Sequence, residues 1–441
     1  MAINEIYESV KEYVRQLERN KEKHLINPEK DFTRHRKISF SDCVMSVLCM
    51  SGGTLFSEIL EYFSEKIDLP SVSAYLQQRA KIKYSAFEQL FRFTVDLADD
   101  NRLYHGYRLF AADGSEIQIP SNPMDEDTYY PGSNGQKPYN LIHLNAIYDI
   151  ITNTYQDVFI QGSRHCAEHE ALNHMVDRSC VKKALVIADR GYESYNVMAH
   201  IKEKGWKYLI RVKDISGNGI VSRLDLPSDD EFDIDIDLNM TRKTSNKMKR
   251  LFEDRNHYRY APQNSKFDFL PSRSGYKEDA VFYRLPFRVV RFQITDNQYE
   301  TIVTNLDKYE FTPVELKKLY AMRWGIETSF RTLKYNIGVI YFHSWKKELV
   351  MQEVFARLAL FNITASIACC EPLKHISKKN YSYRVNVARV ILICRKLFLD
   401  RISPHYAQRL ISTSVVPIRN ERSFKRRTKP GIAVNFIYRI A

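Results

Sequence analysis

The sequence predicts an α/β protein with a mixed sheet covered by helices. Two observations indicate this class: three strand-like segments joined by turns, and an alternation of helix and strand patterns after them. In chain order the strands are expected at residues 107–113, 143–150 and 154–162, followed by a helix at 168–177, a strand at 184–189, a helix at 194–204 and a strand at 206–212. The first three strands are short, alternating or apolar runs bounded by turn residues such as Asn153, which predicts an antiparallel meander.

Two of these strands are expected to stop at an aspartate. Residues 107–113 read YRLFAAD and residues 184–189 read ALVIAD, and a glycine follows each aspartate within two positions. An Asp near Gly is often only a turn former, so neither aspartate is informative alone. Together they predict that Asp113 and Asp189 lie at the carboxyl ends of two buried strands.

A helix is expected across residues 319–334 (LYAMRWGIETSFRTLK). Just upstream, Thr312, Pro313 and Glu315 supply an N-cap, a first-turn proline and a capping-box acid. The apolar residues of the segment recur at the spacing of a helix face that packs on a core. The helix prediction therefore does not depend on its polar residues.

The polar residues Tyr320, Arg323, Glu327 and Lys334 follow one another at offsets of three, four and seven. At about 100° per residue they fall within roughly 60° of arc, so one helix face presents an acid, two cations and a phenol. By itself this pattern also fits a solvated face with Glu and Arg pairs. With Asp113 and Asp189, Glu327 completes a trio of carboxylates, the oxygen ligands that Mg²⁺ prefers in phosphoryl transfer.

The four-residue pattern, together with the ADGS segment at Asp113 and the ADRGY segment at Asp189, resembles the DDE transposases of bacterial insertion sequences that carry a Tyr-Arg-Glu-Lys signature. The resemblance covers roughly residues 102–370. It implies an RNase H-like catalytic core in which Asp113, Asp189 and Glu327 hold two Mg²⁺ ions, with Mn²⁺ able to substitute. One ion would activate the attacking oxygen and the other would stabilise the leaving oxygen.

The resemblance also implies how the neighbouring residues contact DNA. Arg323 and Lys334 would clamp phosphates near the scissile bond, and Tyr320 would hydrogen-bond the backbone. Trp324 would stack on a displaced base, as in relatives that form hairpin ends; a core tryptophan is the alternative. The implied partners are double-stranded DNA at the terminal inverted repeats of the element, target DNA, and a second copy of the chain in a homodimeric DNA complex.

The chain is expected to divide into five parts. These are a helical DNA-recognition domain at 1–100, the first part of the core at 101–212, a β-rich insertion at 213–306, the second part of the core with the signature helix at 307–370, and a basic helical C-terminal region at 371–441. The insertion contains FDIDIDL at 232–238 and a hairpin at 289–306 that turns near Asp296 and Asn297. Because FDIDIDL lacks the glycine and distal glutamate of a calcium loop, we interpret it as a half-exposed strand.

The amino-terminal part contains two helix patterns, at 55–66 and 71–81, joined around residues 68–70. They fit a helix-turn-helix, whose second helix would offer four side chains to DNA, and they fit a plain helical packing module almost as well. The four side chains are Tyr75, Gln77, Gln78 and Arg79.

Charge favours a polyanionic partner. The chain has 66 Lys and Arg against 53 Asp and Glu, a formal charge of +13 and a pI near 9.2. Residues 371–441 hold 16 basic and three acidic residues, so this segment alone carries +13. Its densest part, 419–429 (RNERSFKRRTK), suits phosphate contact, although a solvated or disordered basic end fits this segment equally well.

Cysteine usage and hydropathy favour a cytoplasmic, nucleoid-associated protein. Seven cysteines without paired spacing argue against a disulfide framework. Four residues at 165–174, His165, Cys166, His169 and His174, cluster but lack a second pair at zinc-finger spacing, so zinc is not expected. Signal-peptide and membrane-span patterns are not found.

Two other functions remain open from the residues. The chain could be an RNase H-like DNA nuclease without strand transfer, for which the basic tail and Lys334 are not needed. It could also be a domesticated DNA-binding factor, although the presence of all three acids argues against lost chemistry. The interpretation that accounts for most observations is a metal-dependent endonuclease that also joins DNA, that is, a transposase acting in DNA recombination.

Overall fold

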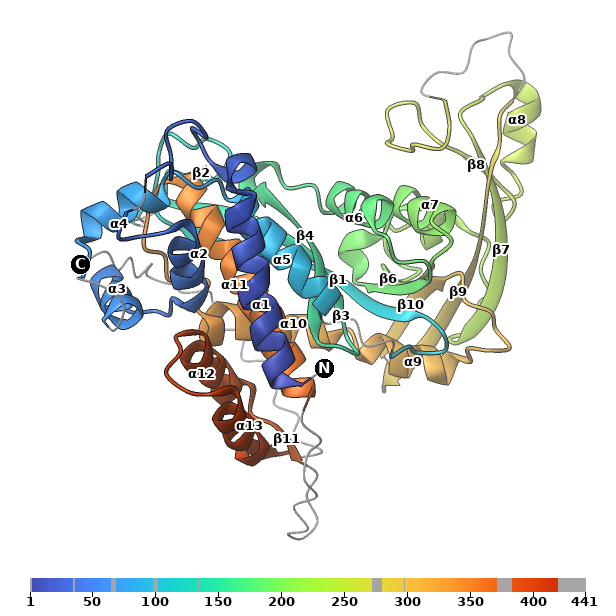
Figure 1. The fold of residues 1–441 in the computed structure, drawn as a ribbon. Helices are drawn as coiled ribbons and strands as arrows, with labels where there is room; N and C mark the ends of the chain where they lie inside the picture. Colours follow the sequence, from blue (N-terminus) through green and yellow to red (C-terminus); the bar gives the residue numbers. More distant parts are fainter. Residues whose placement is uncertain are drawn as a thin grey trace.

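The structure is a computed structural model. It describes residues 2–34, 36–64, 69–97, 102–132, 135, 137–271, 280–296, 298–370 and 383–418. Figure 1 shows a central sheet, a helical mass on one side of it that includes both the amino-terminal helices and α11–α13, and an extension on the other side formed by β7, β8, β9 and α8. Within the described residues, no helix combines the length and the hydropathy needed to cross a bilayer.

One mixed sheet organises the molecule, in the order β2-β3-β1-β5-β6-β10-β9-β7-β8, with β4 paired to β3. The strands are β1 Arg108–Ile119, β2 Tyr129–Tyr130, β3 Tyr139–Asp149, β4 Thr154–Gly162, β5 Ala184–Ala188, β6 Lys207–Val212, β7 Phe232–Thr241, β8 Tyr258–Tyr260, β9 Tyr283–Thr295 and β10 Gln298–Thr304. The pairs β1–β3 and β3–β4 are antiparallel, whereas β1–β5 and β5–β6 are parallel. The predicted meander and the mixed α/β class are therefore confirmed. Asn153 takes a positive φ of 59° in the turn between β3 and β4.

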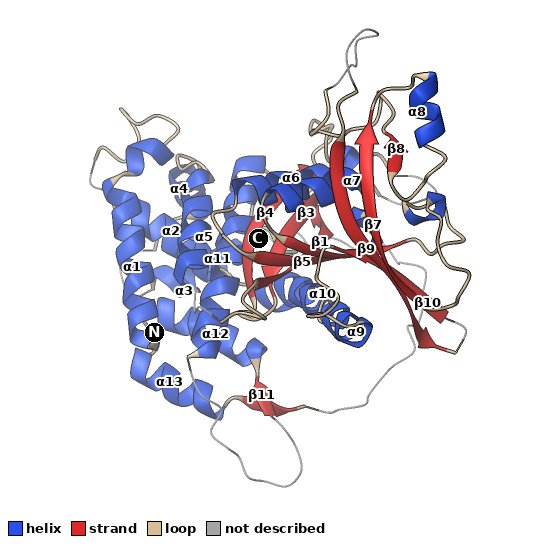
Figure 2. Cartoon of the chain, turned by 90° about the vertical axis from the view of Figure 1, so that its right-hand side faces the viewer, coloured by secondary structure: helices blue, strands red, loops and turns tan. Residues whose placement is uncertain are grey.

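Helices cover both faces of this sheet (Figure 2). On β1, Phe110 and Ala112 pack against α6 (Glu168–Arg178) and α7 (Tyr195–Glu203), whereas Leu109 and Ala111 belong to the cores on the opposite face. That opposite face carries α9 (Pro313–Ala321), α10 (Trp324–Arg331) and α11 (Lys347–Cys369). Because strand side chains alternate, odd-numbered residues of β1 face α10 and even-numbered residues face α6.

Strand β1 is longer than the sequence predicts. It continues through Asp113 to Ile119, paired along this length with β3, so the expectation that a strand stops at Asp113 is wrong. The parallel partner β5 is what ends there: the last register pair is Ala112 with Ala188. Gly114 and Ser115 look like turn formers in isolation, but the antiparallel hydrogen bonds of β3 keep them extended.

The strands of segment 213–306 extend the central sheet. The predicted hairpin is present as β9 and β10, with a turn at Asp296; Asn297 lies outside the described residues. Strand β10 pairs with β6, so the inserted strands and the first part of the core share one sheet. The FDIDIDL segment is a strand, and its aspartates pair with cations: Asp233 with Arg288, Asp235 with Lys308 and Asp237 with Arg284. The helix α8 (Asn246–Leu251) lies in the same segment.

The amino-terminal helices form one core with α11 and with the carboxyl-terminal helices. They are α1 Ile3–Arg19, α2 Phe40–Cys49, α3 Leu55–Phe63, α4 Val72–Arg79 and α5 Ser85–Leu97, joined by α12 Val387–Phe398 and α13 Pro404–Thr413. Short strands β11 (Tyr383–Val385) and β12 (Val415–Pro417) pair beside α12 and α13. The segment 419–429, predicted to contact phosphates, lies outside the described residues.

Three of the four side chains predicted to read DNA from α4 are buried. Tyr75, Gln78 and Arg79 face the core and only Gln77 is exposed, so the recognition-helix prediction is wrong for these three residues. The sequence could not show this, because long polar side chains become core residues only when a distant partner satisfies them. For Arg79 the partner is Glu353 of α11, which is remote from α4 along the chain.

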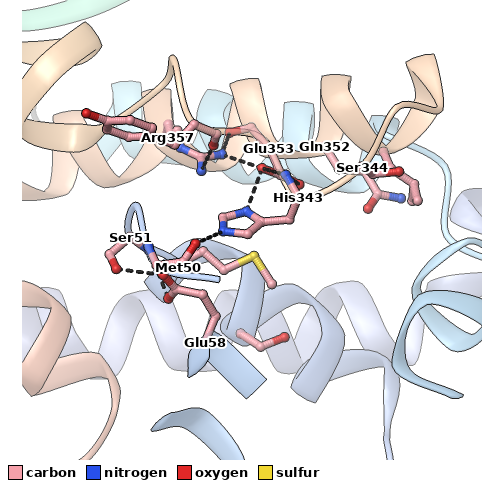
Figure 3. Close-up of polar contacts among 12 residues, drawn as sticks. Met50, Ser51, Glu58, His343, Ser344, Gln352, Glu353 and Arg357 are labelled. Atoms are coloured by element: carbon pink, nitrogen blue, oxygen red, sulfur yellow. Dashed lines mark hydrogen bonds and ion pairs between the residues drawn. The ribbon is translucent and has the colours of Figure 1, made fainter. Parts of the chain in front are cut away.

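Glu353 of α11 is the centre of a fully buried polar network. Its carboxylate lies 3.0 Å from Nη1 of Arg79, 3.0 Å from Nη1 of Arg357 and 3.1 Å from Nδ1 of His343. Nε2 of His343 lies 3.1 Å from the carbonyl oxygen of Gly53. Figure 3 shows His343 between Glu353 and the segment that precedes α3. The network joins α4, α11 and the α2–α3 connection, and the cations around it hold the pKa of Glu353 well below its usual range although burial opposes this.

Candidate functional site

Sheet topology brings Asp113 and Asp189 side by side. Asp113 lies on β1, one residue beyond the last register pair with β5, and Asp189 follows the last residue of β5. In a parallel pair these positions are neighbours at the same edge. Each carboxylate also accepts a hydrogen bond from the next residue's amide, Gly114 for Asp113 (2.9 Å) and Arg190 for Asp189 (2.6 Å).

Glu327 lies near the two aspartates because all three carboxylates contact the Arg323 guanidinium. Nη2 of Arg323 lies 2.6 Å from Oε1 of Glu327 and 3.8 Å from Oδ2 of Asp189, and Nη1 lies 3.5 Å from Oδ2 of Asp113. The two contacts of Nη2, 2.6 and 3.8 Å, place those oxygens of Glu327 and Asp189 no more than 6.4 Å apart. Three carboxylates that are far apart in the sequence thus surround one guanidinium, whose side chain is only 6% exposed.

The environments of the two aspartates differ. Burial, with smaller contributions from Glu327 and Asp189, raises the pKa of Asp113 to about 6, against the lowering effects of the Gly114 amide and Arg323. Burial also acts on Asp189, but the Arg190 amide and the guanidinium groups of Arg211 and Arg323 hold the pKa of that carboxyl below its usual range. A cation placed among these groups would favour the ionised form of Asp113.

The signature segment is not one continuous helix. Helix α9 ends at Ala321, a turn follows, α10 begins at Trp324, and residues Thr332–Ile337 form a π-helix. In the turn, the amides of Met322 and Arg323 donate to carbonyls three residues back. The expectation that one regular helix face presents all four polar residues is therefore wrong. The tighter turn lets Arg323 point into the acidic cluster, where three carboxylates compensate its buried charge.

Tyr320 and Arg211 complete the surroundings of Asp189. The Tyr320 hydroxyl donates to Oδ1 of Asp189 at 3.4 Å, and burial together with this carboxylate raises the pKa of Tyr320 to about 12, so the phenol stays neutral. Arg211, on β6, donates to Asp189 at 2.8 Å and to Glu300 at 2.9 Å. Sequence reasoning missed Arg211; the available signal was a single cation in the otherwise apolar end of the strand WKYLIRV.

Trp324 borders this cluster, whereas the charge that acts on Lys334 is that of Glu116. Burial lowers the pKa of Lys334 although the charge of Glu116 on β1 opposes this, and no hydrogen bond to its ammonium group is found among the described residues. Trp324 is 54% exposed, which excludes a core tryptophan, and its ring lies 5.9 Å from the Arg323 guanidinium carbon. An exposed indole beside the acids is free to contact a ligand.

The donor set fits a divalent metal with a preference for oxygen. The donors are the carboxylate oxygens of Asp113, Asp189 and Glu327. Among the described residues, Arg323 is the only cation that contacts all three of them. The four residues of segment 165–174 do not form a site with one another. His169 contacts the Gly191 carbonyl and His174 stacks on Phe159.

Comparison with known proteins connects this geometry to one family. Residues 104–363 match the family model described as "Transposase DDE domain". No curated protein matches the chain. Among solved structures, the cryo-EM structure of the piggyBac transposase synaptic complex with hairpin DNA is similar with a TM-score of 0.44 and 9% identity, over 90% of this chain and 77% of that chain. A TM-score this low does not by itself support a functional assignment.

Proposed function

Since the chain belongs to the transposase DDE domain family, we propose that it cuts DNA at the ends of its own mobile element and joins those ends to target DNA. The element would be a bacterial insertion sequence of the Tyr-Arg-Glu-Lys group. The observation that carries the proposal is the convergence of Asp113, Asp189 and Glu327 on Arg323 from three separate elements.

Asp113, Asp189 and Glu327 would together hold the divalent metal that members of this family generally use, here Mg²⁺ as two ions. The metal would supply activation of the attacking oxygen and stabilisation of the leaving oxygen. Asp189 is ready for this role because Arg211, Tyr320 and its own strand-end geometry orient it. Asp113, whose pKa is raised to about 6 mainly by burial, would be held in its ionised form by a bound cation.

Arg323 has a second role in this proposal. Its guanidinium contacts all three acids, and its Nε atom is buried without a hydrogen-bond partner. Once other cations neutralise the acids, the same guanidinium would be available to a phosphate at the scissile bond. Tyr320 and Trp324 lie beside it and would contact the DNA backbone and a displaced base, and Lys334 would contact a further phosphate.

A basic hollow next to Asp189 gives the DNA a second place of contact. It has a volume of about 420 Å³ and is lined by cations from four segments, Arg190, Lys213, Arg223 and Arg259. Arg190 directly follows Asp189, so the hollow begins at the same end of β5 as that acid. Sequence-independent phosphate contacts of this kind provide affinity, while the acids provide chemistry. Double-stranded element ends, target DNA and a second copy of the chain are the proposed partners, at the nucleoid of the cytoplasm.

The test uses DNA that flanks the gene. The purified full chain is incubated with Mg²⁺ and with linear DNA carrying the sequences just outside the coding region, and products are resolved on denaturing gels. Cleavage at inverted repeats, followed by appearance of joined products, supports transposition. Cleavage without joined products indicates a nuclease only, and binding without cleavage indicates a DNA-binding factor. Equal activity of Glu327→Gln and of the unmodified protein contradicts the proposed site.

A further inference from the structure

A second cluster of metal-ligating side chains lies across the sheet from the acids. It consists of His143 on β3, Cys166 just after the short helix Ser163–His165, and Glu168 at the start of α6. One ligand atom from each residue lies within 4.8 Å of the other two. The cluster lies on the α6 face of the sheet, because the even-numbered Gly114 of β1 points to it whereas Asp113 points to α10.

The chemistry of the three donors differs from that of the acidic cluster. An imidazole nitrogen, a thiol sulfur and a carboxylate oxygen form the donor set of Zn²⁺, while Mg²⁺ prefers oxygen alone. In a tetrahedral zinc site with the usual bond lengths of about 2.0–2.3 Å, donor atoms lie roughly 3.3–3.7 Å apart. The separations here reach that range with small movements of Cys166 and Glu168, both of which are partly exposed.

The buried His143 ring already faces one of the other two donors. The residue is only 9% exposed, and its Nε2 atom is buried without a hydrogen bond of acceptable geometry, although it lies 3.0 Å from Oε1 of Glu168. Buried polar atoms in native proteins normally make well-aligned hydrogen bonds, so this nitrogen, close to the Glu168 carboxylate but poorly aligned with it, is placed to share an ion with that carboxylate.

Gly114 leaves the space that this arrangement needs. A Cβ atom at this position would lie 2.2 Å from Nε2 of His143 and 2.8 Å from Oε1 of Glu168, closer than atoms can approach. The site is also open on one side, because Cys166 and Glu168 line a hollow of about 490 Å³ with Asn173 and Lys266. Three protein donors with access for a fourth ligand match the coordination of zinc.

We propose that His143, Cys166 and Glu168 bind one Zn²⁺ ion per chain, separate from the metal at the acids. The ion ties β3, the segment around Cys166 and the start of α6 together behind Gly114, the residue after Asp113. The zinc ion therefore helps to hold β1 in place and does not take part in DNA cleavage or joining. This proposal does not rest on the proposed transposition activity.

The first test uses Co²⁺ as a spectroscopic substitute for zinc. The full chain is stripped with a chelator, dialysed and titrated with Co²⁺. We expect a thiolate-to-cobalt charge-transfer band that saturates at one equivalent, persists in excess Mg²⁺ and disappears when one equivalent of Zn²⁺ is added. Cys166→Ser should lose the band, whereas Cys180→Ser, at an exposed cysteine elsewhere, and Asp189→Asn, in the acidic cluster, should keep it.

The second test needs no variant and so does not depend on the folding of one. Iodoacetamide labelling of the unmodified chain is followed by peptide mass spectrometry with and without Zn²⁺. Labelling of Cys166 should slow about tenfold or more when free zinc exceeds its dissociation constant tenfold, and labelling of Cys180 in the same sample should not change. Equal labelling of Cys166 in both samples, or a cobalt band that survives Cys166→Ser, overturns the proposal whether or not the protein cuts DNA.

Discussion

The substitution Glu353→Gln should unfold the junction between α11 and the amino-terminal helices at much milder conditions than the unmodified protein withstands. The carboxylate is fully buried and contacts two guanidinium groups, those of Arg79 and Arg357, and the His343 ring. Glutamine keeps the shape but removes the charge, which leaves two buried cations without compensation. Breaking a buried ion pair in this way costs about 3–5 kcal/mol of unfolding free energy.

The matched control is Glu61→Gln. Glu61 also bridges two helices, because it pairs with Lys396 of α12 at 2.6 Å, but both side chains of this pair are largely exposed. A surface pair of this kind contributes about 0–1 kcal/mol. Urea unfolding of both variants, followed by circular dichroism, should therefore separate them by at least about 2 kcal/mol.

The pH dependence supplies a second readout. The pKa of Glu353 in the folded chain lies below the ordinary value of 4.5, so its stabilising contribution is fully present above pH 4.5 and is lost as pH falls toward the folded-state pKa. The unmodified protein should lose stability steeply below about pH 4.5, and Glu353→Gln should show a flatter curve there. If Glu353→Gln is no less stable than Glu61→Gln, the network does not hold these helices together.

Four further predictions concern the site and the DNA surfaces. Glu327→Gln should lower cleavage about a hundredfold or more while element-end binding, measured by gel shift, stays within about twofold. Arg211→Gln removes the side chain that donates a hydrogen bond to Asp189 and orients it, so cleavage should fall about ten- to a hundredfold. Trp324→Ala should reduce 2-aminopurine quenching at an element end without changing the unfolding midpoint, since the indole is exposed. Neutralising the five basic residues of the tail should flatten the slope of log affinity against log salt by up to about 0.9 for each DNA phosphate that the tail no longer neutralises; the residues are Arg422, Lys425, Arg426, Arg427 and Lys429.

Each of these has a control and an opposing outcome. Glu203→Gln serves as the control for Glu327→Gln, because Glu203 pairs with Lys202 of α7 and touches none of the three acids; equal loss of DNA binding in Glu327→Gln would indicate a structural role. For Arg211→Gln the control is Arg284→Gln, which breaks the distant pair with Asp237, and cleavage as fast as in that control would refute the orienting role of Arg211. Unchanged 2-aminopurine quenching in Trp324→Ala would show that the displaced base does not stack on Trp324. An unchanged salt slope in the tail variant would move the DNA surface to other cations, such as those of the hollow beside Asp189.

Local patterns in the sequence determined most strands of the sheet and the helices α3, α4, α6, α7 and α9. The strand at residues 154–162 is predicted with its observed bounds, and the N-cap at Thr312 begins α9 as expected. Such features depend on side-chain alternation and on capping, which act over a few residues. The family match over residues 104–363 agrees with the extent of the resemblance read from the motifs.

Only tertiary contacts determined the length of β1, the burial of Arg79 and the turn at Arg323. Pairing with β3 carried β1 past Asp113, and a carboxylate in α11 turned Arg79 from an expected DNA contact into a core residue. The turn at Arg323 interrupts a segment of good helical periodicity, and there the Arg323 charge meets Glu327 of the same segment and two aspartates from distant strands. Arg211 and His143 acquire their partners in the same way. A buried charge is stable only where the fold brings opposite charge to it, and that proximity is a property of the assembled sheet and its helices.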